Sequence, residues 1–184
     1  MDILEAKNLL GQRVLNKNLI KHCLAVGAIM KDLAERFNQN VSDWEIAGIL
    51  HDIDYETTKN DPDKHSLEGA AALDALGLDE EIVDAVRTHN EIHGLPPKTL
   101  MAKALFVSDP ISGLIVAAVL VLPSKKLSDL NKENIVNRFS EKSFAKGANR
   151  EIISKCWNLL NLSLEEFSDI ALKAMQKISN ELEL

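Results

Sequence analysis

The sequence is poor in proline, glycine and aromatic residues. Its 184 residues include five prolines and eight glycines, and aromatic residues make up 4%. So few prolines and glycines argue against long irregular stretches. The scarcity of aromatics leaves a core of Leu, Ile, Val and Ala, a composition that favours helices. Hydrophobic residues make up 46%, which excludes a disordered chain and suffices for one domain with a substantial core.

Cysteine is also scarce. The two cysteines, Cys23 and Cys156, lie far apart and show neither metal-site spacing nor a disulfide pattern. Both fall in apolar helical contexts, where a small buried hydrophobic residue is expected. The N-terminus lacks the basic start of a signal peptide. We therefore expect a reducing, cytoplasmic environment.

Two further features are missing: an excess of basic charge and a very long hydrophobic run. The formal net charge is -7, whereas binding to a phosphate backbone normally leaves a basic footprint. Stable nucleic-acid binding is therefore not expected. The longest apolar run, residues 111–122, is shorter than the roughly 20 residues that span a bilayer. We expect it to form a buried helix, and we expect no membrane association.

Helical periodicity runs through most of the sequence, and strand alternation is almost absent. Helices are predicted at about residues 3–15, 18–37, 42–51, 64–76, 80–91, 99–122, 149–160 and 164–182. The third and the last begin with capping-box patterns, Ser42 to Glu45 and Ser163 to Glu166. This pattern predicts an all-α fold.

Three local signals refine these predictions. Asp79 is expected to cap the helix that follows it. Residues 54–63 are polar and contain Asn-Asp-Pro, which predicts a loop. Pro110 should kink or restart the helix that contains it.

The most informative segment is Gly48-Ile-Leu-His51-Asp52-Ile-Asp54, in which an apolar helix ends at an imidazole beside a carboxylate. Two such side chains can both reach one divalent cation, and their donor atoms suit borderline and hard first-row metals. Other candidate ligands lie in or beside predicted helices: His22, His65, His89 and Asp109. Each could be an ordinary polar residue on a helix surface, but the ordered set favours a shared metal site.

The order of His22, His51-Asp52 and Asp109 resembles the HD-domain superfamily of metal-dependent phosphohydrolases. The flanking segments His65-Ser-Leu-Glu-Gly69 and Ser108-Asp109-Pro-Ile-Ser-Gly113 support the resemblance, which covers about residues 18–120. It implies a single helical-bundle domain over residues 1–184, with a metal-binding core at about 18–120 and C-terminal helices at 124–184. It also implies His22, His51, Asp52 and Asp109 as ligands of a divalent metal, with Mn, Fe, Co, Ni, Mg and Zn all compatible.

The roles of His65 and His89 leave two interpretations open. Members of the family with two metals add histidines between the doublet and the last aspartate. By that resemblance, both histidines would hold a second metal and Asp52 would bridge the two. Alternatively, they surround a single metal or contact phosphate. His93, next to Gly94, is expected to be an exposed histidine at a helix end.

Such a site would attract phosphate although the protein is acidic. Two aspartates balance one divalent ion, and a second ion makes the site positive. A metal also lowers the pKa of bound water, supplying hydroxide that could attack phosphorus. Asp54 and Glu56 follow the doublet and could orient the water or accept its proton, with Asp52 as the central catalytic carboxylate. The alternative for Asp54 and Glu56 is a solvated acidic loop.

A basic stretch occupies residues 124–150. We predict that Lys146 and Arg150 reach into the cleft and hold a substrate phosphate, Arg150 through two parallel hydrogen bonds. The alternative is a solvated charged face.

These features predict a cytoplasmic metal-dependent phosphohydrolase acting on a small phosphate ester, with a nucleotide favoured. One alternative is an HD-type di-iron oxygenase, which would use the same six ligands and show iron-dependent oxygen uptake. Another is a non-catalytic module that senses a nucleotide or a metal, which would keep its metal but hydrolyse no phosphate ester.

Overall fold

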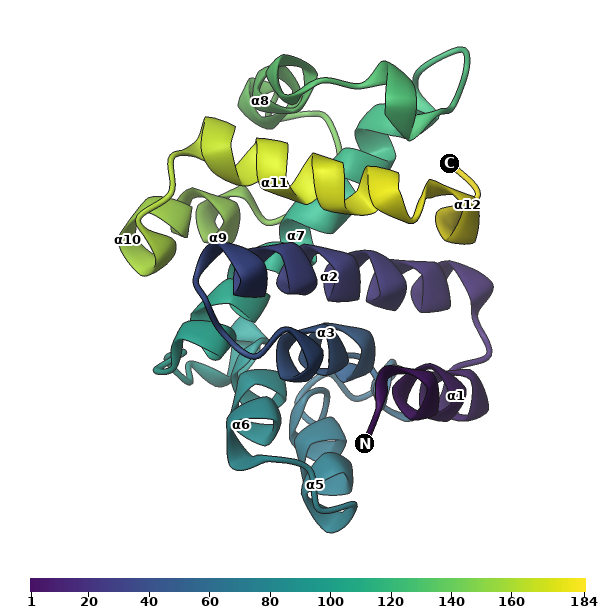
Figure 1. Ribbon diagram of the computed structural model, residues 1–184, viewed down its shortest axis with the longest axis vertical. Helices are drawn as coiled ribbons and strands as arrows, with labels where there is room; N and C mark the ends of the chain where they lie inside the picture. The colour runs from purple at the N-terminus through teal and green to yellow at the C-terminus, as the bar shows by residue number, and fades with distance from the viewer.

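A computed structural model describes residues 1–184, and it confirms the all-α prediction (Figure 1). The elements in chain order are α1 (Ile3–Arg13), α2 (Lys17–Arg36), α3 (Val41–Leu50), α4 (Tyr55–Thr58), α5 (Leu67–Ala75), α6 (Glu80–Thr88), η1 (Glu91–His93), α7 (Leu100–Leu120), η2 (Leu127–Asp129), α8 (Lys132–Ser140), α9 (Arg150–Ser154), α10 (Cys156–Leu160), α11 (Leu164–Lys177) and α12 (Ser179–Leu182). No strand is present.

The two longest helices, α2 and α7, connect the two halves of the molecule. In Figure 1, α1, α3, α5 and α6 lie on one side of α2, and α8 to α12 lie on the other. Helix α2 packs against α3, α7 and α11, and α7 also packs against α6, α9 and α10. A cluster of 49 buried apolar residues runs through both halves, so a continuous core supports the helices that carry the candidate site.

Helices α2 and α3 approach each other backbone to backbone at Gly27 and Gly48. A Cβ atom on Gly48 would lie 2.6 Å from Cα of Gly27, and one on Gly27 would lie 2.7 Å from Cγ1 of Ile49. Only glycine permits so close an approach. His22 lies a little more than one turn before Gly27, and His51 follows Gly48 within one turn. The contact therefore brings these two histidines together.

Helix α7 is continuous through Pro110, so the helix does not restart there as the sequence suggested. Its C-terminal part is buried on one face only, because Ile111, Leu114 and Ile115 are inaccessible whereas Leu120 and Val121 are more than half exposed, which corrects the expected buried helix. By length and composition alone, α7 could cross a membrane, but 61% of its most apolar window is buried within the fold. Core helices of soluble proteins can have the same length and apolar composition.

The helix boundaries correct several details. Asn40, and not Ser42, caps α3, because its side chain accepts hydrogen bonds from the backbone N–H groups of Ser42 and Asp43. Glu45 instead forms an ion pair with Lys31, with 3.1 Å between Nζ and Oε2. The predicted caps at Asp79 and Ser163 are confirmed.

Three predicted segments differ in their extent. The predicted loop after the doublet contains the short helix α4, and the predicted helix at 149–160 is divided into α9 and α10. Helix α5 begins at Leu67 because Ser66 has a φ of 72°, a left-handed conformation that ends the preceding turn. His65 consequently lies in a turn before α5 and does not start the helix.

Candidate metal centre

The structure brings all six candidate ligands together from distant parts of the chain. His22 comes from α2, and His51 and Asp52 follow the end of α3. His65 precedes α5, His89 caps the C-terminal end of α6, and Asp109 lies within α7. The two long helices α2 and α7 and the ends of shorter helices thus converge on a single site.

The carboxylate of Asp52 lies between two groups of side chains. We call His22, His51 and Asp109 the outer group, and His65 and His89 the inner group. Oδ2 of Asp52 lies 3.7 Å from Nε2 of His22 and 3.5 Å from Nε2 of His51. Oδ1 lies 3.3 Å from Nε2 of His65 and 3.5 Å from Nε2 of His89. Each oxygen of Asp52 therefore faces a different group.

The outer group is completed by Asp109 and is the more accessible of the two. Oδ1 of Asp109 lies 3.1 Å from Nε2 of His22, and the Nε2 atoms of His22 and His51 are 3.2 Å apart. The side chains of His22 and Asp109 are 25% and 35% exposed. In the inner group, His89 is only 2% exposed. Solvent and ligands therefore reach the centre from the side of His22 and Asp109.

Two of the histidines are oriented by backbone carbonyls. Nδ1 of His51 donates to the carbonyl of Gly48 at 2.8 Å, and Nδ1 of His89 donates to the carbonyl of Val86 at 2.7 Å. A carbonyl only accepts, so Nδ1 must carry the proton in both rings. In the neutral ring, Nε2 is then left with a free lone pair directed at the centre.

The other two histidines are oriented by side chains. Nδ1 of His65 donates to Oδ1 of Asp54 at 3.0 Å. Nδ1 of His22 lies 3.0 Å from Oγ of Ser112, whose hydroxyl donates to the carbonyl of Asp109 at 2.8 Å. Because the hydroxyl proton is already used, His22 is the donor. Metal-binding histidines in proteins are commonly oriented by such hydrogen bonds.

This donor set fits divalent metal ions. Four Nε2 atoms and two carboxylates converge, and in the neutral rings none of the converging atoms carries a proton. Two lone pairs only 3.2 Å apart, as on His22 and His51, repel each other unless a cation or a proton lies near both. Two triads that share His51, namely His22-His51-Asp109 and His51-Asp52-His89, each have ligand atoms close enough to hold an ion. Imidazole and carboxylate suit Mn, Fe, Co, Ni and Zn.

Burial and neighbouring charges set the protonation of the centre. Burial lowers the pKa of His51 to about 4, which keeps this ring neutral at physiological pH. Burial also disfavours the charged form of His65, but hydrogen bonds to Asp52 and Asp54 outweigh it and raise the pKa of His65 to about 10. Burial alone would raise the pKa of Asp52, yet the surrounding histidines hold it well below its usual value. Asp52 is therefore an anion in the metal-free protein.

Asp54 lies behind His65 and positions it, and the expectation that Asp54 orients the water or accepts its proton stays a prediction. Its Oδ1 accepts from His65, and its Oδ2 accepts from the backbone N–H groups of Ser66 and Gly69, both at 2.9 Å. A Cβ atom on Gly69 would lie 3.1 Å from the carboxylate carbon of Asp54, so a glycine here leaves room for the carboxylate. With both oxygens engaged, Asp54 fixes His65 and the start of α5.

Glu56 is directed elsewhere, contrary to its predicted role at the water. Its Oε1 accepts from the backbone N–H groups of Leu15 and Asn16, at 3.1 and 2.9 Å, and Oε2 pairs with Lys59 at 3.3 Å. Hydrogen bonding to Asn16 and Lys59 holds its pKa below the usual value. Glu56 therefore ties α4 to the connection between α1 and α2.

Arg150 is also committed to the backbone, which corrects its predicted contact with phosphate. Its guanidinium donates to six carbonyls, those of Arg138, Phe139, Glu141, Phe144, Ala145 and Ala148. The shortest bond, to Phe144, is 2.5 Å. Arg150 therefore fixes the loop between α8 and α9 and presents no free edge to a phosphate.

Lys146 stays a prediction, because it is exposed and forms no ion pair. Its neighbours Gly147 and Ala148 line an open cavity of about 350 Å³ together with His22 and Asp109. Lys146 itself lines an adjoining cavity that also contains Gly147 and Ala148. The lysine thus lies close to the open side of the centre.

Sequence reasoning missed two residues that orient the ligands. Nε2 of His93 donates to the carbonyl of His65 at 2.7 Å, so this half-buried histidine is not the exposed helix end that we expected. Ser112 orients His22, as described above. The only sequence signal for Ser112 is its place one turn after Asp109 on the same helix.

Comparisons with known proteins agree with this geometry. The family model of the HD domain matches residues 19–114. Ribonuclease Y of Nitratidesulfovibrio vulgaris (strain DP4) is 32% identical over 142 residues, which are 74% of this chain and 27% of that protein. Ribonuclease Y of Geotalea uraniireducens (strain Rf4) is 30% identical over 159 residues, 84% of this chain and 29% of that protein.

The chain therefore spans less than a third of the length of these curated relatives. The family model, in contrast, matches more than half of the chain and extends from α2 into α7. All six candidate ligands, including Asp109, lie within the matched residues. The chain belongs to the HD-domain family, within the superfamily of metal-dependent phosphohydrolases.

Proposed function

We propose that this protein is a metal-dependent phosphohydrolase with two divalent ions, acting on a small phosphate ester, in particular a nucleotide. The observation that carries the proposal is the position of Asp52, whose two oxygens face separate sets of histidine Nε2 atoms. A carboxylate placed in this way can bridge two ions. The outer group and Oδ2 would hold one ion, and the inner group and Oδ1 would hold the other.

Different residues would supply the charge, the ligand orientation and the substrate contact of the site. When bound, divalent ions would activate water for attack on phosphorus and neutralise the charge of the phosphoryl oxygens. Asp52 and Asp109 supply two negative charges, so a site with two divalent ions would be positive and would attract phosphate. Asp54 and Ser112 hold the rings of His65 and His22 in place, and Lys146 is proposed to contact a substrate phosphate from the open side.

A second candidate is cleavage of RNA phosphodiester bonds. The relatives named Ribonuclease Y favour it. The net charge of -7 disfavours a long RNA substrate, because such a substrate normally meets a basic surface. We therefore place the small ester first. The same six side chains are also compatible with a di-iron oxygenase, which iron-dependent oxygen uptake would reveal, and with a non-catalytic sensing module.

The deciding experiment measures metal content by elemental mass spectrometry and phosphate release from a panel of nucleotides and a short RNA. We expect about two ions per chain and turnover of mononucleotides. Asp52→Asn should lose most bound metal and turnover while its circular dichroism stays helical. Asp63→Asn is the matched control, because Asp63 is exposed and forms no ion pair. Absence of metal after reloading, or full turnover in Asp52→Asn, would refute the proposal.

A further inference from the structure

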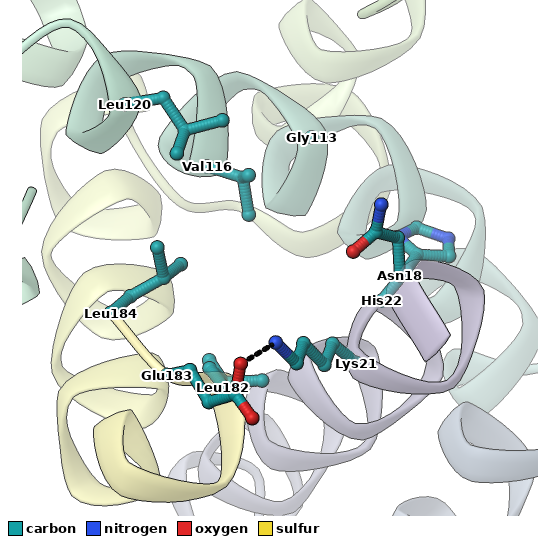
Figure 2. A pocket seen from close by; sticks show the side chains of 9 residues that line it. All are labelled: Asn18, Lys21, His22, Gly113, Val116, Leu120, Leu182, Glu183 and Leu184. Atoms are coloured by element: carbon teal, nitrogen blue, oxygen red, sulfur yellow. Dashed lines mark hydrogen bonds and ion pairs between the residues drawn. The ribbon is translucent and has the colours of Figure 1, made fainter. Parts of the chain in front are cut away.

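A second cavity, of about 440 Å³, is lined by His22 and Gly113 and extends to the C-terminal segment (Figure 2). Helix α7 contributes Val116 and Leu120 to its wall, and the C-terminal segment contributes Leu182 and Leu184. Cavities of this size hold small organic ligands in other proteins. The metal ligands, apart from His22, do not line it.

This cavity adjoins the one at the outer group. His22 and Gly113 line both, so the two cavities meet at this pair of residues. A Cβ atom on Gly113 would meet no atom within 4 Å. Because no side chain fills the space beside Gly113, one ligand can extend from Asp109 past Gly113 into the second cavity.

The wall of the second cavity favours an uncharged group. The only cation and the only anion in the lining, Lys21 and Glu183, neutralise each other through an ion pair of 2.5 Å, drawn as a dashed line in Figure 2. The remaining wall is mainly aliphatic. Asn18 is exposed at the edge, and its side-chain amide forms no hydrogen bond within the protein, so it is free to bind a polar edge of a ligand.

We propose that this second cavity binds the aromatic base of a nucleoside phosphate whose phosphate lies beside His22 and Asp109. The proposal rests on the proposed function, because it assumes that the phosphate is held at the centre. The base packs against Val116, Leu120 and Leu182, and the amide of Asn18 hydrogen-bonds to its edge. The same base-and-phosphate unit occurs in a free nucleotide and at the end of an RNA chain.

The test uses adenosine, which has the base but no phosphate and is not a substrate. Calorimetry should show adenosine binding at least about tenfold more tightly than ribose, with or without added metal. Gly113→Leu, which places a side chain in the junction, should abolish this difference. Gly11→Leu is the matched control, because Gly11 is also helical and also has open space at its Cβ position. Leu120→Glu, at a half-exposed position, serves as a second variant that places a charge in the wall.

Turnover separates this proposal from the proposed function. Equal binding of adenosine and ribose, or unchanged adenosine binding in both Gly113→Leu and Leu120→Glu, would overturn the cavity assignment even if phosphate esters are hydrolysed. Selective adenosine binding without any hydrolysis of adenosine 5′-monophosphate would support the assignment of the cavity to a base and contradict the proposed hydrolysis of nucleotides. A short oligoadenylate with a terminal phosphate, compared with the mononucleotide, distinguishes the RNA end from the free nucleotide as the source of the base.

Discussion

The outer and inner groups offer similar ligand atoms to Asp52 but are held in different ways. In the inner group, His65 is fixed by a buried carboxylate, that of Asp54, which also binds two backbone N–H groups. In the outer group, His22 is fixed by the neutral hydroxyl of Ser112, and two of the three side chains are partly exposed. For the two ions that we propose, we therefore expect the ion at the inner group to exchange slowly and the ion at the outer group to contact ligands.

Removing one ligand from each group should have the largest effect. We expect His89→Ala to reduce the metal content from about two ions to about one, and His22→Ala to do the same for the other ion. Turnover should be lost in both variants, because each ion supplies part of the activation. Elemental mass spectrometry provides the count. Loss of both ions in either single variant would show that the two groups do not bind independently.

Asp54→Ala should weaken the inner group by removing the carboxylate that orients His65. The variant leaves the N–H groups of Ser66 and Gly69 without partners and removes the anion beside His65, at a cost of about 3 kcal/mol in the free energy of unfolding. Affinity for the inner ion should fall by roughly 10–100-fold. Urea unfolding and metal titration measure the two quantities. A variant with normal stability and one weakened ion would argue that Asp54 acts on the metal alone.

Gly48→Ala should disturb the outer group through the helix contact. The added methyl would lie 2.6 Å from Cα of Gly27, so α2 and α3 must separate, at a cost of about 2 kcal/mol. His22 and His51 should then bind the outer ion more weakly, while the inner ion is retained. Gly11→Ala is the control, because a methyl group there meets no neighbour. Equal stability of the two variants would contradict the close contact.

Ser112→Ala should have a smaller effect, confined to His22. Loss of one buried hydrogen bond costs about 1 kcal/mol of stability, and the outer ion should bind roughly tenfold more weakly. The measurement is a competition titration with a chromogenic chelator. If Ser112→Ala instead weakened the inner ion, the division into two groups would be wrong.

The pH dependence of metal binding should be the smallest of these effects, but it reports directly on the protonation of the inner group. The pKa of His65 is about 10 in the metal-free protein, so at neutral pH this ring carries a proton that must leave before Nε2 can bind an ion. Uptake of the inner ion should therefore release a proton, and its affinity should rise with pH up to about 10. Calorimetry in buffers of different ionisation enthalpy measures the released protons. No release at pH 7 would contradict a charged His65.

The sequence predicted the helices and the convergence of the ligands better than the roles of the polar residues around them. The order of His22, His51, Asp52 and Asp109 is visible along the chain because a family pattern contains it. The role of Asp54 is not visible, because it depends on the left-handed turn at Ser66 that directs two N–H groups at the carboxylate. Glu56 likewise finds its partners at Leu15 and Asn16, far away in sequence.

The roles of residues in the basic segment could not be predicted from the sequence either. Lys146 and Arg150 look alike as cations near a site, yet only the folded loop offers six carbonyls to the guanidinium of Arg150. His93 lies next to Gly94, which suggests an exposed end, but the turn η1 folds it back onto His65. The contact of His93 joins segments 28 residues apart, whereas the carbonyls around Arg150 lie within 12 residues of it and converge only once the loop is folded.

The hydrogen bonds of Arg150 have a consequence for how this scaffold can diverge. The loop between α8 and α9, which borders the centre through Gly147 and Ala148, is held by the six hydrogen bonds that its carbonyls accept from Arg150, and also by Phe144, which packs against the core. Every residue type has a carbonyl, so these six hydrogen bonds place no demand on which side chains the loop carries. At exposed positions of this border, such as Lys146, substitutions can therefore change which ligands are bound without altering the path of the loop or the helices that carry the histidines.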